Sequence, residues 1–307
     1  MFDQIFGNYL VRAGRISKEQ LADVISYEST VRVKLGLIAV SEKLMTKEQA
    51  DEVNQLQTIM DKRFGDIAVE KGYLTEDEVE QLLKKQGNIY MLFVQTLIDK
   101  EYMTLEEIDD ALKAYQKEQG FTHSSMDDLV SGDIERTVKL FLPPDTDLYG
   151  KLCGIAVRTL LRIINSNAYV AKAYLVSELS ADNFAMQAME GDHSIISGFA
   201  GAENSLLSIA ESFAEEKFER VDMDALDSVG EFTNCINGLF ASELSLDGID
   251  VDMVPPEFYE KPVVIRGNQF CVFPIIIGEN IVNFVLSIDT DISIDTDVSA
   301  DADISAD

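Results

Sequence analysis

The sequence is poor in the residues that build most metal sites and nucleophilic sites. Its 307 residues include only two histidines, His123 and His193, whose placement suits neither a histidine-based metal site nor a Ser-His-Asp triad. The three cysteines, Cys153, Cys235 and Cys271, are scattered and form no Cys-x-x-Cys pair. The sequence therefore signals neither a zinc site nor a disulfide framework, and we expect the chain to hold no metal of its own.

Basic residues are also scarce. The chain has 25 lysines and arginines against 55 aspartates and glutamates, for a net charge of −30. Phosphate backbones and anionic membrane surfaces attract clustered basic side chains, so the composition argues against nucleic acid and membrane partners. Such a chain attracts a basic surface or an exposed lysine on a partner protein, although we expect most of the acidity to serve solubility.

Long apolar runs are missing as well. No stretch of about 18 apolar residues exists, and the first residues lack the basic and apolar regions of a signal peptide. Free thiols fit a reducing compartment. We therefore expect a cytoplasmic protein without membrane insertion. Its length and its 46% hydrophobic content predict two domains of ordinary size.

A period of 29 residues is present in the first part of the chain. Each repeat contains a capping box, in which a Ser or Thr hydroxyl accepts from the backbone amide three residues later and a Glu or Gln side chain reaches back. The boxes begin at Ser17, Thr46, Thr75 and Thr104. The hydrophobic staples around them are Ile16 with Leu21, Met45 with Ala50, Leu74 with Val79 and Met103 with Ile108. These capped repeats predict an all-α module of helix pairs over residues 1–120.

Two of the repeats resemble the N-terminal domain of type II secretion and pilus assembly ATPases, called MshEN. The form of that domain that binds cyclic-di-GMP has two motifs, each opening with Arg-Leu-Gly and closing with Gln. Here Lys34-Leu35-Gly36 leads to Gln57, and Arg63-Phe64-Gly65 leads to Gln86. The residues to which the resemblance assigns cyclic-di-GMP binding are Lys34, Gly36, Gln57, Arg63, Gly65 and Gln86.

The same stretch departs from the MshEN pattern. Lys34 replaces an arginine. A guanidinium group can both stack on guanine and form a bidentate contact with phosphate, whereas an ammonium group cannot do both. Phe64 replaces a leucine. A structural or protein-docking role for the repeats therefore stays open beside nucleotide binding.

After the repeats we predict a linker over residues 121–145, an α+β domain over residues 146–288 and a disordered acidic tail over residues 289–307. The predicted helices are Leu148 to Ile164, Ala210 to Phe218 and the stretch around Leu226 to Phe240. The predicted strands are Ala168 to Val176, 262–265, 269–277 and 281–288, with a hairpin of His193 to Gly198 and Ser205 to Ile209 around the turn 201–204.

Glu231 and Asn234 are the most specific chemical feature of this second domain. Apolar residues at spacings of three and four surround the pair and predict a helix, on which positions i and i+3 lie on one face. Such a pair is often only a solvated helix face. Asparagine is, however, a poor residue for the middle of a helix, which favours a particular reason for its presence.

The surrounding sequence resembles the CheX branch of the CheC, CheX and FliY chemotaxis phosphatases. The segments that carry the resemblance are Ser197 to Gly201, Asp227 to Asn234, Asn237-Gly238 and Pro255-Pro256. It implies hydrolysis of the aspartyl phosphate on a CheY-like response regulator in two-component signalling. Asn234 would then orient the attacking water and Glu231 would pair with the regulator's lysine.

The resemblance also implies that the Mg²⁺ of the reaction belongs to the regulator, and that the chain forms a homodimer. The helix from Leu148 to Asn165 has no second Glu-x-x-Asn, so one site per domain is expected. Two other functions stay open at this point, a non-catalytic signalling adaptor and an interaction protein that responds to cyclic-di-GMP.

Overall fold

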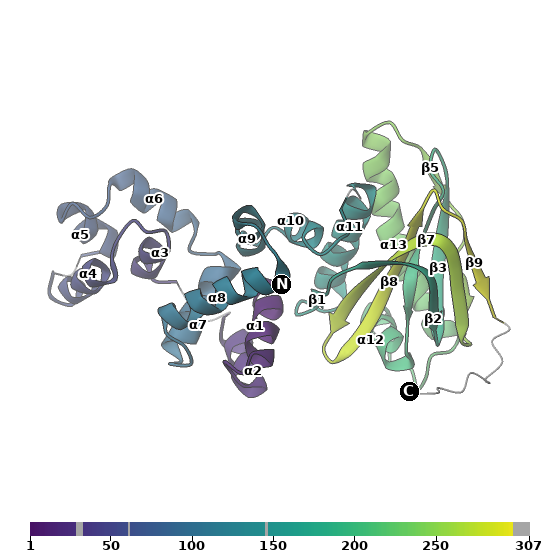
Figure 1. Ribbon diagram of the computed structural model, residues 1–307, viewed down its shortest axis with the longest axis horizontal. Coiled ribbons are helices and arrows are strands. Elements are labelled where there is room, and N and C mark those ends of the chain that lie inside the picture. The colour runs from purple at the N-terminus through teal and green to yellow at the C-terminus, as the bar shows by residue number, and fades with distance from the viewer. Residues whose placement is uncertain (29–32, 61, 145–146, 297–307) are drawn as a thin grey trace. The chain divides into compact units, whose positions relative to one another are not determined.

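The computed structural model describes residues 1–28, 33–60, 62–144 and 147–296, and its contacts divide the chain into two compact units (Figure 1). The N-terminal unit is Phe2–Asp133, and the C-terminal unit begins at Ile134. The predicted fold class is confirmed, since an all-α part precedes a part of mixed helices and strands. The expected domain start near residue 146 and the end of the acidic tail, residues 297–307, lie outside the described residues.

Most of the N-terminal unit consists of helix pairs that follow the 29-residue period. Their bounds are α1 (Phe2–Arg12) and α2 (Lys18–Glu28), α3 (Leu35–Ser41) and α4 (Lys47–Met60), α5 (Phe64–Glu70) and α6 (Glu76–Lys84), and α7 (Ile89–Asp99) and α8 (Leu105–Gln119). The predicted capping boxes at Ser17, Thr46, Thr75 and Thr104 are confirmed, because the hydrogen bond in each direction is present at every one. The staple residues are buried, except for the half-buried Val79.

The repeats pack in nested pairs rather than one after another. Helix α3 contacts α4, α5 and α6, so the second and third repeats form an inner pair. Helix α1 contacts α2, α7 and α8, so the first and fourth repeats form an outer pair. The two pairs contain equivalent hydrogen bonds at positions 29 residues apart. In the inner pair, Glu52 accepts from Lys71 (2.8 Å) and Tyr73 (2.6 Å). In the outer pair, Asp23 accepts from Lys100 (3.0 Å) and Tyr102 (2.7 Å). These hydrogen bonds hold the pKa values of both carboxyl groups below their usual range.

An aromatic core closes the outer pair. The ring of Phe2 meets Tyr90 edge-on at a centroid distance of 5.2 Å, and Tyr9 lies 4.9 Å from Tyr115. Phe6 contacts both Phe93 and Tyr115. Burial raises the pKa of Tyr115, which is only 3% exposed. The first and last repeats are therefore joined by packing between residues far apart in the sequence.

The region 121–145, which the sequence predicts to be a linker, contains two short helices. Helix α9 (His123–Val130) starts at Thr122, whose hydroxyl accepts from the Ser125 amide at 3.1 Å. Helix α10 (Ile134–Lys139) follows and packs on α11. One buried apolar side chain on each helix, Leu129 on α9 and Val138 on α10, gives that helix a packed face.

The C-terminal unit is built on one antiparallel sheet with the strand order β1-β7-β8-β4-β3-β5, on which β2 and β9 also pair with β7 and β6 pairs with β3. The strands are β1 (Tyr169–Val170), β2 (Tyr174–Ala181), β3 (Asn183–Gly191), β4 (Ile195–Gly201), β5 (Val251–Met253), β6 (Glu257–Tyr259), β7 (Val263–Ile277), β8 (Asn280–Ile288) and β9 (Ile292–Asp295). The register of β3 against β4 sets Gln187 opposite Ser197.

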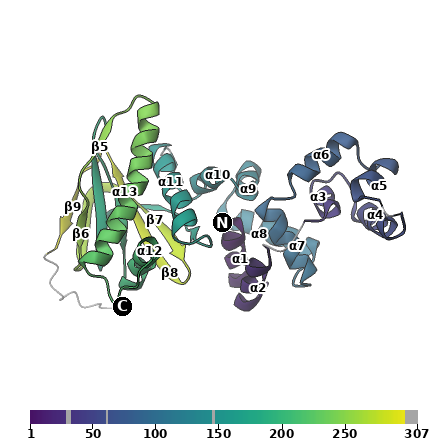
Figure 2. The same ribbon diagram turned by 180° about the vertical axis from the view of Figure 1, so that it is seen from behind.

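Three helices, α11 (Asp147–Ile163), α12 (Glu203–Ala214) and α13 (Met223–Leu246), cover one face of the sheet (Figures 1 and 2). Phe199 of β4 stacks on Phe232 of α13 with 5.6 Å between ring centroids. Alternate strand residues point to the other face, where Phe184, Ala200 and Val285 enter a second apolar cluster. The sheet is thus apolar on both faces, and α13 is held against β3 and β4.

Three details of the second domain differ from the sequence predictions. Ser205 to Ile209 belongs to α12 rather than to a hairpin, because Leu206, Ile209 and Ala210 are buried at helical spacing. The apolar runs 262–265 and 269–277 form the single strand β7. Residues 292–295 of the expected disordered tail form β9, where Ile292 and Ile294 pack on the second apolar cluster.

Candidate functional site

The predicted helix around Glu231 and Asn234 is α13. Its N-cap is Asp222, whose carboxylate accepts from the Ala225 amide at 3.1 Å. Its buried stripe comprises Leu226, Val229, Phe232, Ile236, Phe240 and Leu244. This stripe fixes the rotation of the helix, so Glu231 is exposed and Asn234 is half-buried beside the sheet.

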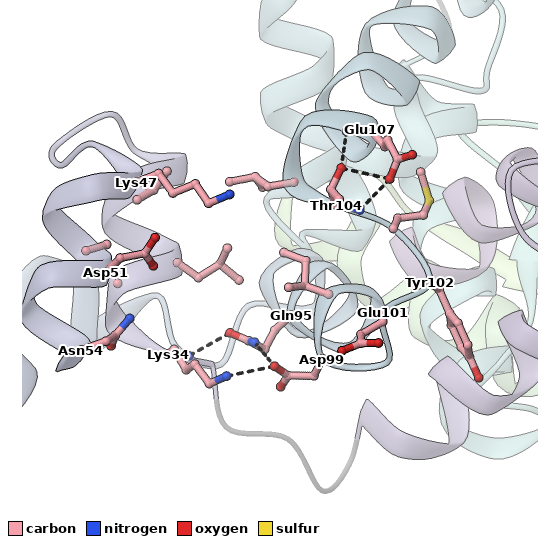
Figure 3. A pocket seen from close by; sticks show the side chains of 17 residues that line it. Lys34, Lys47, Asp51, Asn54, Gln95, Asp99, Glu101, Tyr102, Thr104 and Glu107 are labelled. Carbon is pink, nitrogen blue, oxygen red and sulfur yellow. Dashed lines mark hydrogen bonds and ion pairs between the residues drawn. The ribbon is translucent and has the colours of Figure 1, made fainter. Parts of the chain in front are cut away.

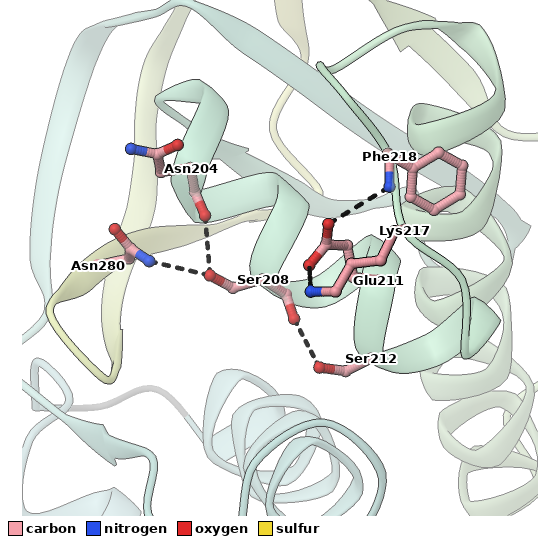
Figure 4. Close-up of polar contacts among 7 residues, drawn as sticks. All are labelled: Asn204, Ser208, Glu211, Ser212, Lys217, Phe218 and Asn280. Atoms are coloured by element: carbon pink, nitrogen blue, oxygen red, sulfur yellow. Dashed lines mark hydrogen bonds and ion pairs between the residues drawn. The ribbon is translucent and has the colours of Figure 1, made fainter.

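Helix α12 holds the chain segment that leads into α13 (Figure 4). The Glu211 carboxylate binds Lys217 at 2.6 Å and accepts from the Phe218 amide at 3.3 Å, and the Lys217 hydrogen bond lowers the pKa of this carboxyl. Glu203, at the other end of α12, accepts from the Val221 amide at 3.0 Å. The start of α13 is therefore positioned by two carboxylates of its neighbour.

Glu231 and Asn234 differ in how they are held. Among the described residues, none makes a hydrogen bond or ion pair with Glu231, so its carboxylate is available to a partner. The Oδ1 atom of Asn234 accepts a hydrogen bond from Nε2 of Gln187 on β3 at 2.8 Å. The structure therefore places an unconstrained carboxylate next to a carboxamide that is tied to the sheet.

A chain of buried polar side chains lies beneath Asn234. Besides Asn234, Nε2 of Gln187 donates to the backbone carbonyl of Val254 at 2.9 Å. Oε1 of Gln187 accepts from Nδ2 of Asn237 at 2.9 Å, and Oδ1 of Asn237 accepts from the Ser197 hydroxyl at 2.7 Å. Gln187 is 2% exposed, and Asn237 and Ser197 are fully buried. We call Ser197, Asn237, Gln187 and Asn234 the polar relay.

Glycine at position 230 allows the chain after β5 to cross α13. A Cβ added there would lie 2.3 Å from Cε1 of Phe258 and 3.2 Å from Cβ of Pro256. Pro256 and Gly230 both belong to the segments that suggested the family resemblance, and the structure joins them in one contact. This contact holds the loop that contains the Val254 carbonyl against the helix.

We expect Gly230→Ala to lower the free energy of unfolding by about 1–3 kcal/mol, because the added methyl group overpacks against Phe258. Gly238→Ala, on the same helix, is the matched control, since the nearest atom is the flexible Met253 side chain at 3.8 Å. At position 238 the higher helix propensity of alanine should raise the free energy of unfolding by about 0.5–1 kcal/mol. Urea denaturation of both variants checks the pair, and equal shifts in one direction would contradict the close approach at Gly230.

A comparison with protein families finds a match in this part of the chain. Residues 184–275 match the family model of the chemotaxis phosphatase CheX. The C-terminal unit is similar to CheX over these residues, and we call it the CheX-like unit. The matched segment runs from β3 into β7, and so it contains Glu231, Asn234 and every member of the polar relay.

Several solved structures share similarity with the CheX-like unit. A CheC-like superfamily protein from Shewanella sp. PV-4 is 21% identical, with a TM-score of 0.43 over 47% of this chain and 98% of its own. CheX from Vibrio vulnificus is 16% identical, with a TM-score of 0.39 over 46% and 99%. CheX in the CheX-CheY-BeF3-Mg²⁺ complex from Borrelia burgdorferi is 20% identical, with a TM-score of 0.37 over 48% and 98%. No curated protein matches the chain.

Gln187 is the site residue that the sequence analysis missed. A signal for it exists, since it is the one polar residue in the run from Phe184 to Met189 and would be buried in a strand flanked by apolar neighbours. Buried amide groups need hydrogen-bond partners. The position of those partners depends on the register of β3 with β4 and on the rotation of α13, neither of which the sequence pattern specifies.

The cysteines of the CheX-like unit do not form a site together. Cys235 is exposed next to Asn234, whereas Cys153 and Cys271 are buried. Burial raises the pKa of Cys271 to about 12, so this thiol is a poor nucleophile at neutral pH. Within the described ranges, no three His, Cys, Asp or Glu side chains are grouped to hold a metal ion, and no helix is long and apolar enough to span a bilayer.

In the N-terminal unit, most of the residues assigned to cyclic-di-GMP line one cavity of the inner pair. This cavity has a volume of about 760 Å³, and five of the six residues lie at it: Lys34, Gln57, Arg63, Gly65 and Gln86. Gly36 lines a second cavity of about 540 Å³, next to α7 and α8. We call the first of these the inner-pair cavity.

Lys34 borders both cavities and is already engaged in the second one (Figure 3). Its Nζ atom lies 2.9 Å from Oδ1 of Asp99, and its backbone amide donates to Oε1 of Gln95 at 3.3 Å. Gln95 also donates to Asp99 at 2.8 Å. An anionic ligand in the inner-pair cavity would therefore compete with Asp99 for this ammonium group.

Among the described residues, the outer pair carries different side chains at the positions equivalent to those of the inner-pair cavity. The residue 29 positions before Lys34 is Ile5. The residues 29 positions after Arg63, Gly65 and Gln86 are, in that order, Leu92, Val94 and Tyr115. Ile5, Val94 and Tyr115 are buried in or beside the aromatic core. The same helical framework therefore carries polar residues around a cavity in one pair and apolar packing in the other.

Proposed function

We propose that the CheX-like unit hydrolyses the aspartyl phosphate of a CheY-like response regulator. The observation that carries this proposal is the placement of the exposed Glu231 and the half-buried Asn234 on α13, inside the segment that matches a chemotaxis phosphatase family. One side chain is unpaired among the described residues, and the other is anchored. Such a pair is incomplete as an active site by itself, and it becomes complete when a partner supplies the phosphoryl group.

The reaction requires little chemistry from this chain. The water oxygen forms a bond to phosphorus while the bond between phosphorus and the aspartate oxygen breaks, and the bonding electron pair leaves with the regenerated carboxylate. The water proton is released to the phosphate or to solvent. Phosphoryl transfer through a loose transition state depends on alignment of the nucleophile more than on covalent help. The regulator's own Mg²⁺ neutralises charge on the phosphoryl oxygens, and no residue of this chain is required to bind it.

Asn234 and Glu231 have different roles in this reaction. Asn234 is neutral, so it orients a water molecule without placing a negative charge next to the phosphoryl oxygens. Alignment of a water molecule in this way lowers the barrier by several kcal/mol through proximity. Glu231 pairs with the regulator's lysine and sets the register of the two proteins, because a carboxylate and an ammonium group attract strongly when the interface excludes water.

The exposed side of α13 also carries apolar side chains suited to a protein partner. Leu239 is 47% exposed and Leu246 is 88% exposed, and Met253 of β5, at 43%, lies next to the same helix at Gly238. Exposed apolar side chains on the helix that carries Glu231 and Asn234 give a protein partner an apolar surface to contact. This surface supports a protein substrate over a small molecule.

The proposed function is tested by measuring phosphate release from phosphorylated receiver domains of the same cell, with and without the full-length chain. We expect a rate above autodephosphorylation for at least one receiver. A receiver that binds the chain but loses phosphate at its unassisted rate would support a non-catalytic adaptor instead. Absence of both binding and phosphate release across all receivers would contradict both functions.

A second candidate function is cyclic-di-GMP binding by the N-terminal unit, and the inner-pair cavity favours it. The Arg63 guanidinium group can fork onto a phosphate and stack on a purine, and Gln57 and Gln86 supply hydrogen-bonding amides at the same cavity. The contrast with the packed outer pair argues that the cavity is not a requirement of the helical framework.

We expect isothermal titration of the full chain with cyclic-di-GMP to give saturable heat, and Arg63→Ala to weaken binding at least tenfold through loss of a charge-assisted contact. Asp99→Asn should strengthen binding, because Lys34 is then released from its ion pair. Asp110→Asn, an exposed aspartate on α8 that pairs with Lys113, is the matched control. No heat from the wild type at roughly tens of micromolar ligand would rule out this ligand.

A further inference from the structure

The direction of every hydrogen bond in the polar relay is set by one backbone carbonyl. The Val254 carbonyl oxygen can only accept, so the atom of Gln187 that lies 2.9 Å from it must be the Nε2 donor. The same nitrogen lies 2.8 Å from Asn234, so Asn234 must present its Oδ1 acceptor toward the sheet. The two N–H bonds of Gln187 are then both used, one by each acceptor.

The other half of the relay agrees with this assignment. With Nε2 fixed as the donor, Oε1 of Gln187 accepts from Nδ2 of Asn237 at 2.9 Å. Oδ1 of Asn237 then accepts from the Ser197 hydroxyl, which rotates freely to donate, at 2.7 Å. Each of these hydrogen bonds therefore joins one donor to one acceptor. A reversed carboxamide at any position would set two donors or two acceptors against each other.

The relay also joins separate parts of the fold. Ser197 lies on β4, Gln187 on β3, Asn237 and Asn234 on α13, and Val254 directly after β5. Gln187, Asn237 and Ser197 are at most 2% exposed, where a hydrogen bond lost without replacement costs about 1–3 kcal/mol. Three of the four members are therefore held firmly, and the fourth, Asn234, reaches the surface.

We propose that Gln187 is a positioning residue for hydrolysis, which acts by fixing the polarity and rotamer of the Asn234 carboxamide. This inference rests on the proposed phosphatase function. With one lone pair of Oδ1 occupied by Gln187, the carboxamide keeps its second lone pair to accept from a water molecule. Among the residues that the structure describes, none accepts from Nδ2 of Asn234, so its two N–H bonds remain donors for the water or the phosphoryl oxygens.

The fixed polarity has a direct consequence for the reaction. A carboxamide that rotates by 180° about its last bond exchanges an acceptor for a donor. A water molecule bound to it would then no longer point a lone pair at the phosphorus atom. Gln187 removes this alternative, because the reversed Asn234 would set its N–H groups against the N–H groups of Gln187. The chain therefore presents the same arrangement of donors and acceptor to the phosphoryl group in every encounter. Less ordering of the carboxamide and the water molecule is then needed to reach the transition state.

The decisive experiment is a double-mutant cycle on phosphate release from the phosphorylated regulator, with the full-length chain. Gln187→Met keeps the length of the side chain and removes both donors. We expect it to lower kcat by about 10- to 100-fold and to leave KM within a factor of about two, because the docking surface of α13 is unchanged. In the Asn234→Ala background the same substitution should lower the rate no further.

Two further variants separate positioning from stability. Ser197→Ala removes the far end of the relay, and we expect a smaller loss of kcat than for Gln187→Met. Ser287→Ala is its matched control, because Ser287 is another fully buried serine of the same sheet and its hydroxyl donates to the Thr290 carbonyl, outside the relay. Ser287→Ala should leave kcat unchanged even where thermal unfolding shows a comparable loss of stability.

The outcomes are distinguishable. Equal losses from Gln187→Met in the wild-type and Asn234→Ala backgrounds, or equal losses from Ser197→Ala and Ser287→Ala, would overturn the positioning role while the phosphatase function stands. Should Gln187→Met fail to fold, the comparison of the two serine variants decides alone. A wild-type chain that releases no phosphate from any receiver would overturn the proposed function, and with it the role of Gln187 in that reaction.

Discussion

Asn234→Ala is expected to lower the rate of assisted dephosphorylation by about 100-fold, with little change in binding of the regulator. The substitution removes the only carboxamide that the relay carries to the surface, so the attacking water loses its fixed partner. Loss of alignment of a reacting group typically costs about two orders of magnitude. Stopped-flow measurement of phosphate release at saturating phosphorylated regulator gives kcat directly.

Two controls define what Asn234 contributes. Asn204→Ala removes an exposed carboxamide from α12 (Figure 4), and it should leave the rate unchanged. Asn234→Asp keeps the shape and the acceptor for Gln187 but adds a negative charge beside an anionic phosphoryl group, and it should be about as slow as the alanine variant. If Asn234→Asp retained the full rate, a neutral water-orienting role would be wrong.

Glu231→Lys should raise KM for the phosphorylated regulator by about 30- to 100-fold, which corresponds to about 2–3 kcal/mol. The wild-type carboxylate has no ion-pair partner among the described residues, so the substitution breaks nothing within the chain. At the interface it replaces an attractive contact with the regulator's lysine by a repulsive one. Titration of the regulator in the phosphate-release assay measures the change.

The control for Glu231→Lys is Glu216→Lys, which makes the same change in net charge in the loop between α12 and α13. Both residues are exposed. A loss of affinity shared by the two variants would show that only the overall electrostatic attraction of a chain with a net charge of −30 had been reduced. A loss confined to Glu231→Lys would indicate a specific pairing.

The helices of the N-terminal unit could be predicted because their signals are local. A capping box needs only two residues three positions apart, such as Thr75 and Glu78, and its hydrogen bonds form within one turn. The nested pairing could not be predicted in the same way. It depends on packing between Phe2 or Phe6 and the distant Tyr90, Phe93 and Tyr115, which no period in the sequence reveals.

In the CheX-like unit the sequence predicted the helix of Glu231 and Asn234 better than it predicted the strands. The apolar spacing from Leu226 to Phe240 is helical throughout, so the shared face of Glu231 and Asn234 follows from it. The stretch from Ser205 to Ile209 is too short for its apolar spacing to distinguish a helix from a strand, so the pattern predicts a strand where the first half of α12 lies. Gln187 was missed because its role depends on the packing of a helix against a sheet.

The nested pairing of the repeats has a consequence for synthesis of the chain. Helix α1 leaves the ribosome before α7 and α8, yet Phe2 and Phe6 pack against aromatic rings on those two later helices. The second and third repeats hold all the helices of the inner pair in one continuous stretch, so they can fold as soon as they emerge. Helix α1 is thus among the last parts of its unit to be buried, and its exposed phenylalanines are a natural target for a chaperone during translation.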